Sequence, residues 1–459
     1  ALKANGKYQE AKKRFEMYKT SGGNSDRIRL AKEELEDFDR KLEELQSQKS
    51  FFETETCPGI NTSAAEFGAV VYNDQLLFTT GRKNDVYNGD GQPFTAIYAF
   101  DYTNKANCQG NARLFDPILH QTGTNEGSPA FAHDDSFVIF SRAGQGEKGE
   151  SSEAHLYISR RTEAGWSDPE LLPYPVNISQ PLYEGGNEDL KGSKGDYWSA
   201  TPCITPDGKR LYFSSNRPGG YGGLDLWRAD INTGGRLSNI RNVGPRVNTP
   251  GDELFPFVSI DGRLFFASTG HFGLGGLDIF MAERRNGRTT VENMGRPVNS
   301  KKDDFAMFFD TDTTGFFSSN RVSGKGGDDI YKFYDRTPDR KKVNYFLAVN
   351  VLGRDKPGED PYPLGTSLVE IYKGDTKHHS TKLDDLRTND KGKTKSVPLE
   401  TTQDYSLVAS AEGYFKEEFD YTLAGKLIPQ DQLKDYREYE IDTTFETTVV
   451  LDKIIVSQG

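Results

Sequence analysis

Four carboxylates stand at matching places in a series of short apolar strands, and they are the first candidates for chemistry. Each lies three residues before an aligned strand position; the set comprises Glu66, Glu126, Glu253 and Asp304, with Ser199 at the fifth place. If these strands surround an axis, two carboxylates at a suitable separation could act as general acid and as nucleophile or base, as in glycosidases.

The same pattern fits two other roles. A repeated carboxylate can cap the loop of its own repeat, or a mouth lined by carboxylates can bind a cation or a sugar. Catalysis favours acids in unlike surroundings, because the acid and the base need different pKa values. The sequence has no G-x-S-x-G, H-E-x-x-H or P-loop motif, so we expect no catalytic residue, no metal and no cofactor.

A glycine-rich segment that occurs three times supplies the second set of candidates. Its copies are SSNRPGGYGGLDLW, ASTGHFGLGGLDIF and SSNRVSGKGGDDIY, which begin at residues 214, 267 and 318. Each copy reads as a strand end, a hairpin loop with a glycine pair, and a new strand. The aspartate after the glycine pair (Asp225, Asp278 and Asp329) is short enough to accept hydrogen bonds from loop N–H groups. We expect these aspartates to hold the loops rather than bind a ligand.

The same loops carry candidates for contact with a partner. Polar ones, which could meet an anionic partner or a glycan or could be solvated, are Arg217, Arg321, Asn216 and Asn320. Aromatic ones are Tyr221 and Phe272, which occupy similar places in neighbouring repeats. These two could anchor a protein interface or pack on each other.

Composition limits the class of protein. The 459 residues are too many for one core, and 69 acidic against 57 basic residues give a net charge of −12. That balance argues against a nucleic-acid partner, which needs a basic surface. No apolar run has the length of a membrane span, and the chain begins inside a helical pattern, so we expect a soluble piece of a longer protein.

The three cysteines lack the spacing of a zinc site. Cys57 and Cys108 both lie in Gly/Asn/Pro-rich segments that bracket one repeat, so they could form a disulfide in an oxidising compartment. Cys203 follows Pro202 inside a strand and is expected to be a buried, inert thiol.

Residues 1–50 are predicted to be helical. Tyr8, Ala11, Phe15 and Tyr18 form one apolar face, and a second helix of about six turns is expected from Ser25 onward. The second helix should pack on the first helix or on the next domain; the alternative is a dimerising coiled coil.

Residues 51–336 change to a period of two and predict a five-bladed β-propeller. Five units of about four strands align on an aromatic strand residue, namely Phe78, Phe140, Phe213, Phe266 and Phe317. The last unit lacks an outer strand, and a spare strand-like segment at 51–56 precedes the first unit. We expect that segment to pair with the last unit and close the ring.

Residues 341–459 predict a β-sandwich, because short alternating strands are expected at 345–351, 367–372, 405–409 and 447–451. The polar stretch 427–439 is expected to be a helix-containing insertion or a mobile loop.

Three resemblances add to this reading. The F-x-S-N-R-x-x-G-x-G-G-x-D-[IL]-[YWF] pattern resembles the WD40-like PD40 repeats of Gram-negative envelope proteins. VNVLGRDKPGEDPYPLGTSLVEIY, TNDKGK and YSLVASAEGYF resemble a carboxypeptidase regulatory-like domain, a transthyretin-like sandwich without hydrolytic machinery. The G-x-Y-x-x-A-x-x-x-F arrangement near the start resembles a helix of a tetratricopeptide (TPR) repeat.

In this order the three parts resemble the OmpA-family peptidoglycan-associated lipoproteins. The resemblance implies a periplasmic, outer-membrane-associated protein, with a lipid anchor and a peptidoglycan-binding OmpA-like domain that this sequence does not contain. It implies envelope or secretion-system proteins as partners, with type IX secretion as one such process. We therefore expect a non-enzymatic scaffold, with a glycan-binding or glycan-cleaving propeller as the alternative.

Overall fold

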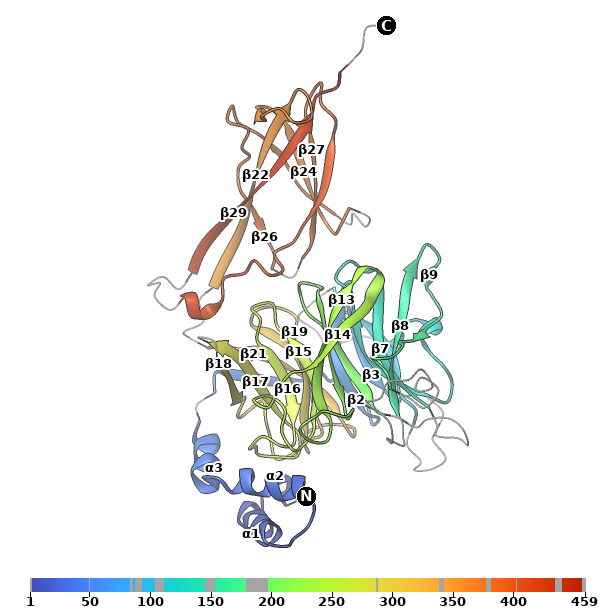
Figure 1. Ribbon diagram of the computed structural model, residues 1–459, viewed down its shortest axis with the longest axis vertical. Coiled ribbons are helices and arrows are strands. Elements are labelled where there is room, and N and C mark those ends of the chain that lie inside the picture. Colours follow the sequence, from blue (N-terminus) through green and yellow to red (C-terminus); the bar gives the residue numbers. More distant parts are fainter. Residues whose placement is uncertain are drawn as a thin grey trace. The chain divides into compact units, whose positions relative to one another are not determined.

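The computed structural model describes most of the chain: residues 2–48, 50–82, 86, 93–103, 111–144, 153–178, 197–285, 288–337, 342–376, 381–401, 403–433 and 440–455. The chain divides into two compact units, Ala1–Arg336 and Thr337–Gly459. It is mainly β, with three α-helices in the described part of the first unit (Figure 1).

The helices are α1 (Tyr8–Lys19), α2 (Ser25–Leu35) and α3 (Phe38–Ser47), preceded by a 3-10 turn at Lys3–Asn5. The prediction of a single long helix from Ser25 onward is wrong, because Asp37 adopts a left-handed conformation with φ of 52°. A right-handed helix cannot continue through such a residue. The break lets α3 start at Phe38, which is buried in a cluster with Tyr8 and Leu274.

No helix among the described residues combines the length and the apolar character that a membrane span requires.

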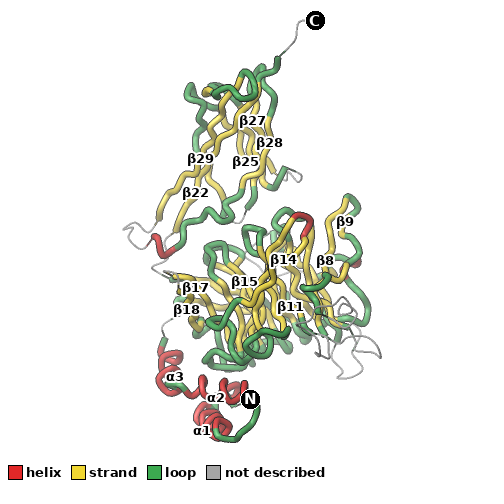
Figure 2. The backbone as a smooth tube through the Cα atoms, viewed as in Figure 1, coloured by secondary structure: helices red, strands yellow, loops and turns green. Residues whose placement is uncertain are grey.

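The described residues of the first unit form five antiparallel sheets, whose strands are drawn in Figure 2. Sheet A contains β2 (Glu66–Tyr72), β3 (Gln75–Thr80), β4 (Ala96–Asp101) and β5 (Arg113–Leu114). Sheet B contains β6 (Asn125–Phe131), β7 (Phe137–Ala143), β8 (Ala154–Thr162) and β10 (Glu170–Leu171), and β9 (Gly165–Trp166) also pairs with β8.

Sheet C contains β11 (Ser199–Ile204), β12 (Arg210–Ser215), β13 (Asp225–Asn232) and β14 (Arg236–Asn242). Sheet D contains β15 (Glu253–Val258), β16 (Leu264–Ser268), β17 (Asp278–Arg285) and β18 (Arg288–Asn293). Sheet E contains β19 (Asp304–Phe309), β20 (Thr314–Ser319), β21 (Asp329–Asp335) and β1 (Phe52–Thr56).

The sheets are arranged as in a β-propeller. Their first strands contact one another in chain order, β2 with β6, β6 with β11, β11 with β15, β15 with β19, and β19 again with β2. We call these five the inner strands. The ring is closed by β1, which pairs antiparallel with β21 from Phe52 opposite Asp335 to Thr56 opposite Tyr331. This is the pairing that the sequence predicts, and it removes an open sheet edge.

Every inner strand contains a β-bulge. The register shifts at the same place in all five strands. At each shift one residue has positive φ: Gly68, Ser128, Thr201, Phe255 and Ala306. Four of the five are not glycine, so the bulges carry strain that other contacts must offset.

Hydrogen bonds between neighbouring sheets supply part of that offset. The N–H of the bulge residue donates to a hydroxyl that follows the aligned aromatic residue of the preceding sheet. The pairs are Ser128 with Thr79 at 3.1 Å, Thr201 with Ser141 at 2.9 Å, and Gly68 with Ser318 at 3.1 Å. Between sheets C and D, Thr201 intervenes: its hydroxyl bonds Ser214 and accepts from the N–H of Phe255 at 3.2 Å.

Sheet D has Ala267 at the place of these hydroxyl residues, so the hydroxyl found at this place in the other sheets is missing beside the Ala306 bulge of sheet E. We predict that Ala267→Ser raises the free energy of unfolding by about 0.5 to 1 kcal/mol, because it supplies the missing acceptor. Urea unfolding of the two proteins measures the change.

The matched control is Ser318→Ala, which removes the acceptor for Gly68. It should lower the free energy of unfolding by about 1 to 2 kcal/mol. A destabilised Ala267→Ser protein would show that this place in sheet D does not tolerate a hydroxyl.

The second unit is a two-sheet sandwich. One sheet contains β22 (Lys342–Arg354), β23 (Tyr362–Pro363), β26 (Val397–Leu399) and β29 (Glu440–Asp452); the other contains β24 (Leu368–Lys373), β25 (Thr381–Arg387), β27 (Tyr405–Ser410) and β28 (Glu417–Tyr421).

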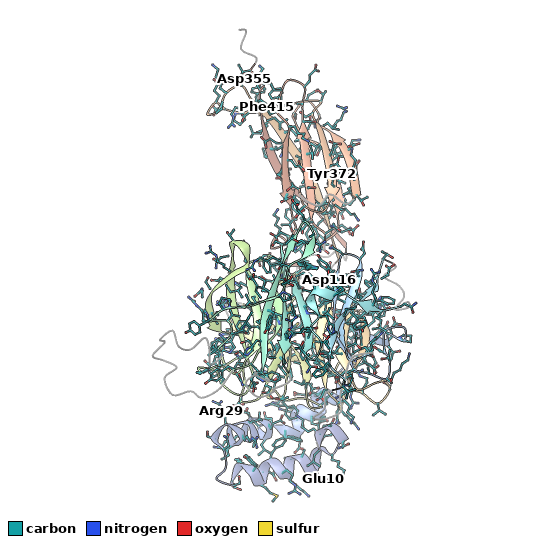
Figure 3. The ribbon with its side chains drawn as sticks, turned by 90° about the vertical axis from the view of Figure 1, so that its right-hand side faces the viewer. Glu10, Arg29, Asp116, Asp355, Tyr372 and Phe415 are labelled. Carbon is teal, nitrogen blue, oxygen red and sulfur yellow. The ribbon has the colours of Figure 1, made fainter. Side chains whose placement is uncertain are left out.

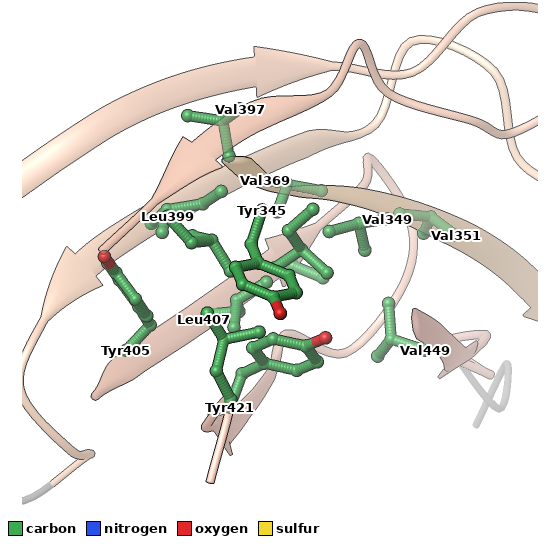
Figure 4. Close-up of a cluster of buried hydrophobic side chains, with 14 of the residues drawn as sticks. Tyr345, Val349, Val351, Val369, Val397, Leu399, Tyr405, Leu407, Tyr421 and Val449 are labelled. Carbon is green, nitrogen blue, oxygen red and sulfur yellow. The ribbon is translucent and has the colours of Figure 1, made fainter. Parts of the chain in front are cut away.

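Side chains from both sheets form the core of the sandwich, with the rings of Tyr345 and Tyr421 among valines and leucines (Figure 4). In the stretch 427–439, Leu427 and Ile428 pack on this core. A 3-10 turn follows at Gln430–Leu433, and residues 434–439 lie outside the described part.

Candidate functional site

A cavity of about 180 Å³ lies on the axis of the ring. Its wall is built from residues of the five inner strands, including Ala69, Pro129, Pro202, Pro256 and Met307. Each of these five residues lies three positions after one of the four carboxylates or Ser199. Among the described residues that line the cavity, the single titratable group is the thiol of Cys203.

The four carboxylates do not line this cavity, which corrects the expectation that they face an axial mouth. Each is at most 1% exposed. They lie at the first or second residue of an inner strand and turn back into their own sheet, because the loops there present N–H and hydroxyl donors. Burial of a carboxylate without such donors would be strongly unfavourable.

Two of the sites show this arrangement clearly. Glu66 accepts from the N–H of Thr62 at 2.7 Å and the hydroxyl of Thr80 at 2.9 Å, and its carboxylate lies 3.1 Å from the Arg82 guanidinium. Glu126 accepts from the N–H of Gln121 at 2.6 Å and from Arg142 at 3.1 Å.

Asp304 repeats the arrangement in sheet E. It accepts from the N–H of Ser300 at 2.6 Å and from Arg321 at 2.5 Å. Arg321 also donates to the carbonyl of Pro297 and lies over the ring of Phe317. Arg321 therefore neutralises a buried acid inside its own chain, and its side chain is 15% exposed.

Arg217 is also directed inward, which corrects the expectation of a partner-binding or solvated loop arginine. Its guanidinium donates to the carbonyls of Pro175 and Val176 and to the hydroxyl of Ser199 at 3.1 Å. It lies over the rings of Phe213 and Trp227. Burial lowers the pKa of Arg217 to about 9.

The loop asparagines hold backbone groups. Asn216 is exposed and accepts from the N–H of Trp198 at 2.8 Å. Asn320 is half-buried; it accepts from the N–H of Asp303 at 2.8 Å and donates to its carboxylate at 2.8 Å.

Sheets C and D depart from the acid and arginine pairing in opposite ways. Sheet C keeps Arg217 but has Ser199 in place of the acid, whereas sheet D keeps Glu253 but has Gly270 in place of the arginine. In sheet D, His271 takes the place of the guanidinium: its Nε2 bonds the carbonyl of Val247 at 2.8 Å, and its ring packs on two phenylalanines. Burial lowers the pKa of His271, so a neutral ring fills this place.

Glu253 is consequently buried with hydrogen bonds, and no Lys or Arg among the described residues forms an ion pair with it. It accepts from the N–H and the hydroxyl of Thr249 at 2.8 and 2.6 Å and from the hydroxyl of Ser268 at 2.7 Å. Burial raises the pKa of Glu253 to about 7, although these hydrogen bonds oppose the rise.

A raised pKa has a definite consequence for stability. The protonated carboxyl stabilises the fold fully below the pKa of the unfolded chain, about 4.3, and this contribution is lost as the pH rises through about 7. We predict that Glu253→Gln removes this dependence of the free energy of unfolding on pH. The free energy of unfolding of the parent minus that of the variant should fall by about 3 kcal/mol between pH 4 and pH 8.5.

Urea unfolding of both proteins at the two pH values measures this difference, in which all other titrating groups cancel. An equal difference at both pH values would show that the pKa of Glu253 in the native state is not raised above that in the unfolded chain.

The motif aspartates accept hydrogen bonds from N–H groups of their own loops. Asp225 accepts from Tyr221 at 2.5 Å, Asp278 from Gly275 at 2.9 Å, and Asp329 from Lys325 at 2.7 Å. In each case Oδ1 is buried and has no hydrogen-bond partner among the described residues. Burial raises the pKa of all three carboxyls, that of Asp278 to about 8.

Phe272 contacts the helical part of the same unit. Its ring meets Phe38 edge to face at a centroid distance of 5.3 Å, and it packs in a cluster with Tyr8, Leu42 and Leu274. The hydroxyl of Tyr8 donates to the carbonyl of Leu274 at 3.1 Å. The motif loop of sheet D is thus the surface on which the helices dock.

Tyr221 and Phe272 are not equivalent in the repeat. Counting back from the motif aspartates aligns Tyr221 with Leu274. Tyr221 is 37% exposed, and its carbonyl accepts from Arg29, which lies on the helical part at the side facing the sheets (Figure 3).

We predict that Phe272→Ser weakens the docking of the helices by about 2 kcal/mol, because it removes a large apolar contact. Hydrogen exchange of the α3 amides should accelerate while that of the inner strands stays unchanged.

Tyr221→Ser is the matched control, since it keeps the backbone carbonyl that Arg29 uses and should leave the exchange of α3 unchanged. Equal exchange of α3 in all three proteins would mean that Phe272 does not hold the helices.

The cysteines differ in what can be described. Cys203 is buried, and burial raises its pKa to about 12. Cys57 is also buried. The expected pairing of Cys57 with Cys108 remains a prediction, because Cys108 lies outside the described residues. Within the described part of the chain, no cluster of three or more His, Cys, Asp or Glu side chains could hold a metal ion.

Two sets of functional side chains were not predicted from the sequence. Arg82 and Arg142 neutralise Glu66 and Glu126, and the hydroxyl residues after the aligned aromatic residues join neighbouring sheets. The second set had a visible signal, because Ser or Thr follows the aromatic residue in four of the five repeats.

Comparison with known proteins found distant likenesses to solved structures only. No family model and no curated protein matches the chain. Among solved structures, TolB from Acinetobacter baumannii is similar at 14% identity and a TM-score of 0.30, with 57% of this chain and 51% of TolB covered, so the chain spans about half the length of that TolB. GH43B of the Bacteroides ovatus xyloglucan locus is similar at 12% identity and a TM-score of 0.36, covering 81% of this chain and 90% of GH43B. At these values neither likeness bears on function.

Proposed function

We propose that the chain is a non-enzymatic scaffold built on a five-bladed propeller, in which sheets A to E are the blades. The helical part is a TPR-like segment, and the second unit is a transthyretin-like, carboxypeptidase regulatory-like sandwich. Its function is to hold other proteins, and the motif loops of the propeller are the surface that does so.

One observation carries the proposal: the four repeated carboxylates are buried and are bound by groups of their own sheets and loops. Glu66, Glu126 and Asp304 each bind an arginine, and all four acids accept hydrogen bonds from loop groups. A general acid or nucleophile must reach its substrate, yet these groups are at most 1% exposed. The axial wall offers apolar side chains in their place.

The motif loops supply a second line of support. The loop of sheet D already binds a helical partner within the same chain, through Phe272 and Leu274. The related loop of sheet E exposes Val322 to 89%. A loop type that docks helices once can do so again, because exposed apolar side chains at hairpin tips suit protein contacts.

The cellular setting is part of the proposal. The order of the three parts resembles PorE of the type IX secretion machinery, within the OmpA-family lipoproteins. We place the protein in the periplasm at the outer membrane. An N-terminal lipid anchor and an OmpA-like peptidoglycan-binding domain would belong to the full-length protein, and envelope or secretion proteins would be its partners.

The glycan-binding or glycan-cleaving alternative needs carboxylates that face solvent from a common mouth. The four candidates face their own loops instead, so no observation favours that alternative.

The scaffold proposal is tested in the cell envelope with a photo-activated cross-linker in place of Val322 of the full-length protein. We predict discrete protein adducts at Val322 and none at Met17, an exposed residue of α1 that serves as the control. The purified chain should not hydrolyse polysaccharide or peptide libraries.

Two results would contradict the proposal. One is hydrolysis that disappears in Glu126→Gln while the fold is kept. The other is a set of adducts that is identical at Val322 and Met17.

A further inference from the structure

The axial cavity is distinct from the loop surfaces that carry the scaffold proposal. It has a volume of about 180 Å³ and lies between strands of all five sheets. We propose that it is a binding site for a single uncharged apolar group, an aromatic ring or a branched aliphatic group.

The volume sets the size of the occupant. An apolar protein cavity of about 150 Å³ accepts benzene, whereas sites for larger molecules usually enclose about 300 to 1,000 Å³. The axial cavity therefore takes one ring or one branched aliphatic group, and it is too small for a sugar chain or a nucleotide.

The wall sets the chemistry of the occupant. Alanine, valine, proline, methionine and phenylalanine side chains form most of it. Two polar groups at the bulges are engaged: the hydroxyl of Thr201 bonds Ser214 and the N–H of Phe255, and the N–H of Ser128 bonds Thr79. A charged ligand would lose its hydration and would meet no Asp, Glu, Lys or Arg side chain among the described residues of the wall.

Three phenylalanines from different sheets close one end of the axis. The rings of Phe67, Phe255 and Phe305 pack together with centroid distances of 6.3, 6.1 and 4.9 Å. They stand where the inner strands begin, next to the buried carboxylates. The occupant would enter from the opposite end, where Val71, Phe131 and Ile204 line the wall.

The site is pre-formed, which favours binding of a small group. Hydrogen bonds between neighbouring sheets hold the bulges around the axis. A rigid wall does not need to be ordered when the ligand binds, so less of the binding energy is lost.

Two sources could supply such a group: a free small molecule, or an apolar side chain on another polypeptide. Both present the same chemistry to the wall. The experiment therefore first tests the chemistry with simple probes and then distinguishes the sources.

The probes are toluene, cyclohexane and benzylammonium, with binding to the purified chain followed by ligand-observed NMR. Toluene and cyclohexane should bind, and benzylammonium should bind at least tenfold more weakly. Ala69→Leu, which fills part of the cavity, should reduce toluene binding at least tenfold. Tyr221→Ser, at a loop away from the axis, is the matched control and should bind toluene as the parent does.

A second measurement needs no variant, because Met307 lines the cavity. In protein labelled at its methionine methyl groups, nuclear Overhauser effects from the protons of bound toluene should reach the Met307 methyl group. Bound toluene without this contact, or binding of benzylammonium as tight as that of toluene, would overturn the proposal.

A competition experiment then distinguishes a free small molecule from a polypeptide side chain as the source of the apolar group. The peptides Gly-Gly-Phe-Gly-Gly and Gly-Gly-Ala-Gly-Gly are compared for displacement of toluene. Displacement by the phenylalanine peptide alone assigns the site to a polypeptide side chain, whereas displacement by neither assigns it to a free molecule. Both results presuppose toluene binding, and neither depends on whether the motif loops bind a partner.

Discussion

A buried carboxylate at the start of an inner strand is the constraint on which the ring of sheets depends. An acid in that place must be surrounded by donors, because an unpaired buried charge is very unfavourable. The chain meets the requirement locally, with a loop N–H, a hydroxyl and, in sheets A, B and E, an arginine. Each acid thereby ties the loop before its strand to the hairpin after it.

Sheets C and D show that the arginine and the acid can be separated. Ser199 stands in place of the acid beside Arg217, and Gly270 stands in place of the arginine beside Glu253. Arg217 and Glu253 nevertheless stay buried among hydrogen-bonding groups. The result in each sheet is a shifted pKa rather than a changed fold, because a group that cannot be paired shifts toward its neutral form. Sheet D is also the sheet whose loop receives the helices through Phe272, so the departure and the docking lie in the same repeat.

Much of the fold follows from repeated patterns in the sequence. The spacing of the aromatic residues and the glycine pairs predicts the strands of sheets C, D and E, and the spare strand at 51–56 predicts the pairing of β1 with β21. Such patterns arise because each repeat has the same hydrogen-bonded framework, which needs the same types of residue at the same positions.

The direction of side chains could not be predicted in the same way. Arg217 reads as a loop residue, yet its long side chain folds back over Phe213 to reach carbonyls some forty positions earlier in the chain. The break at Asp37 has no local signal either, since aspartate is common in exposed helix turns. It is explained by the tertiary burial of Phe38 against the loop of sheet D.

The pairing of β1 with β21 has a mechanical consequence. The two strands are antiparallel, and Phe52 at the start of one lies opposite Asp335 at the end of the other. The chain therefore enters and leaves the ring at the same end of one strand pair. A pulling force between the segments that flank the ring would load the β1–β21 hydrogen bonds one after another, as in a zipper, and not all at once. If the segments that flank the ring were pulled apart, the ring would open between β1 and β21, while sheets A to D stayed folded.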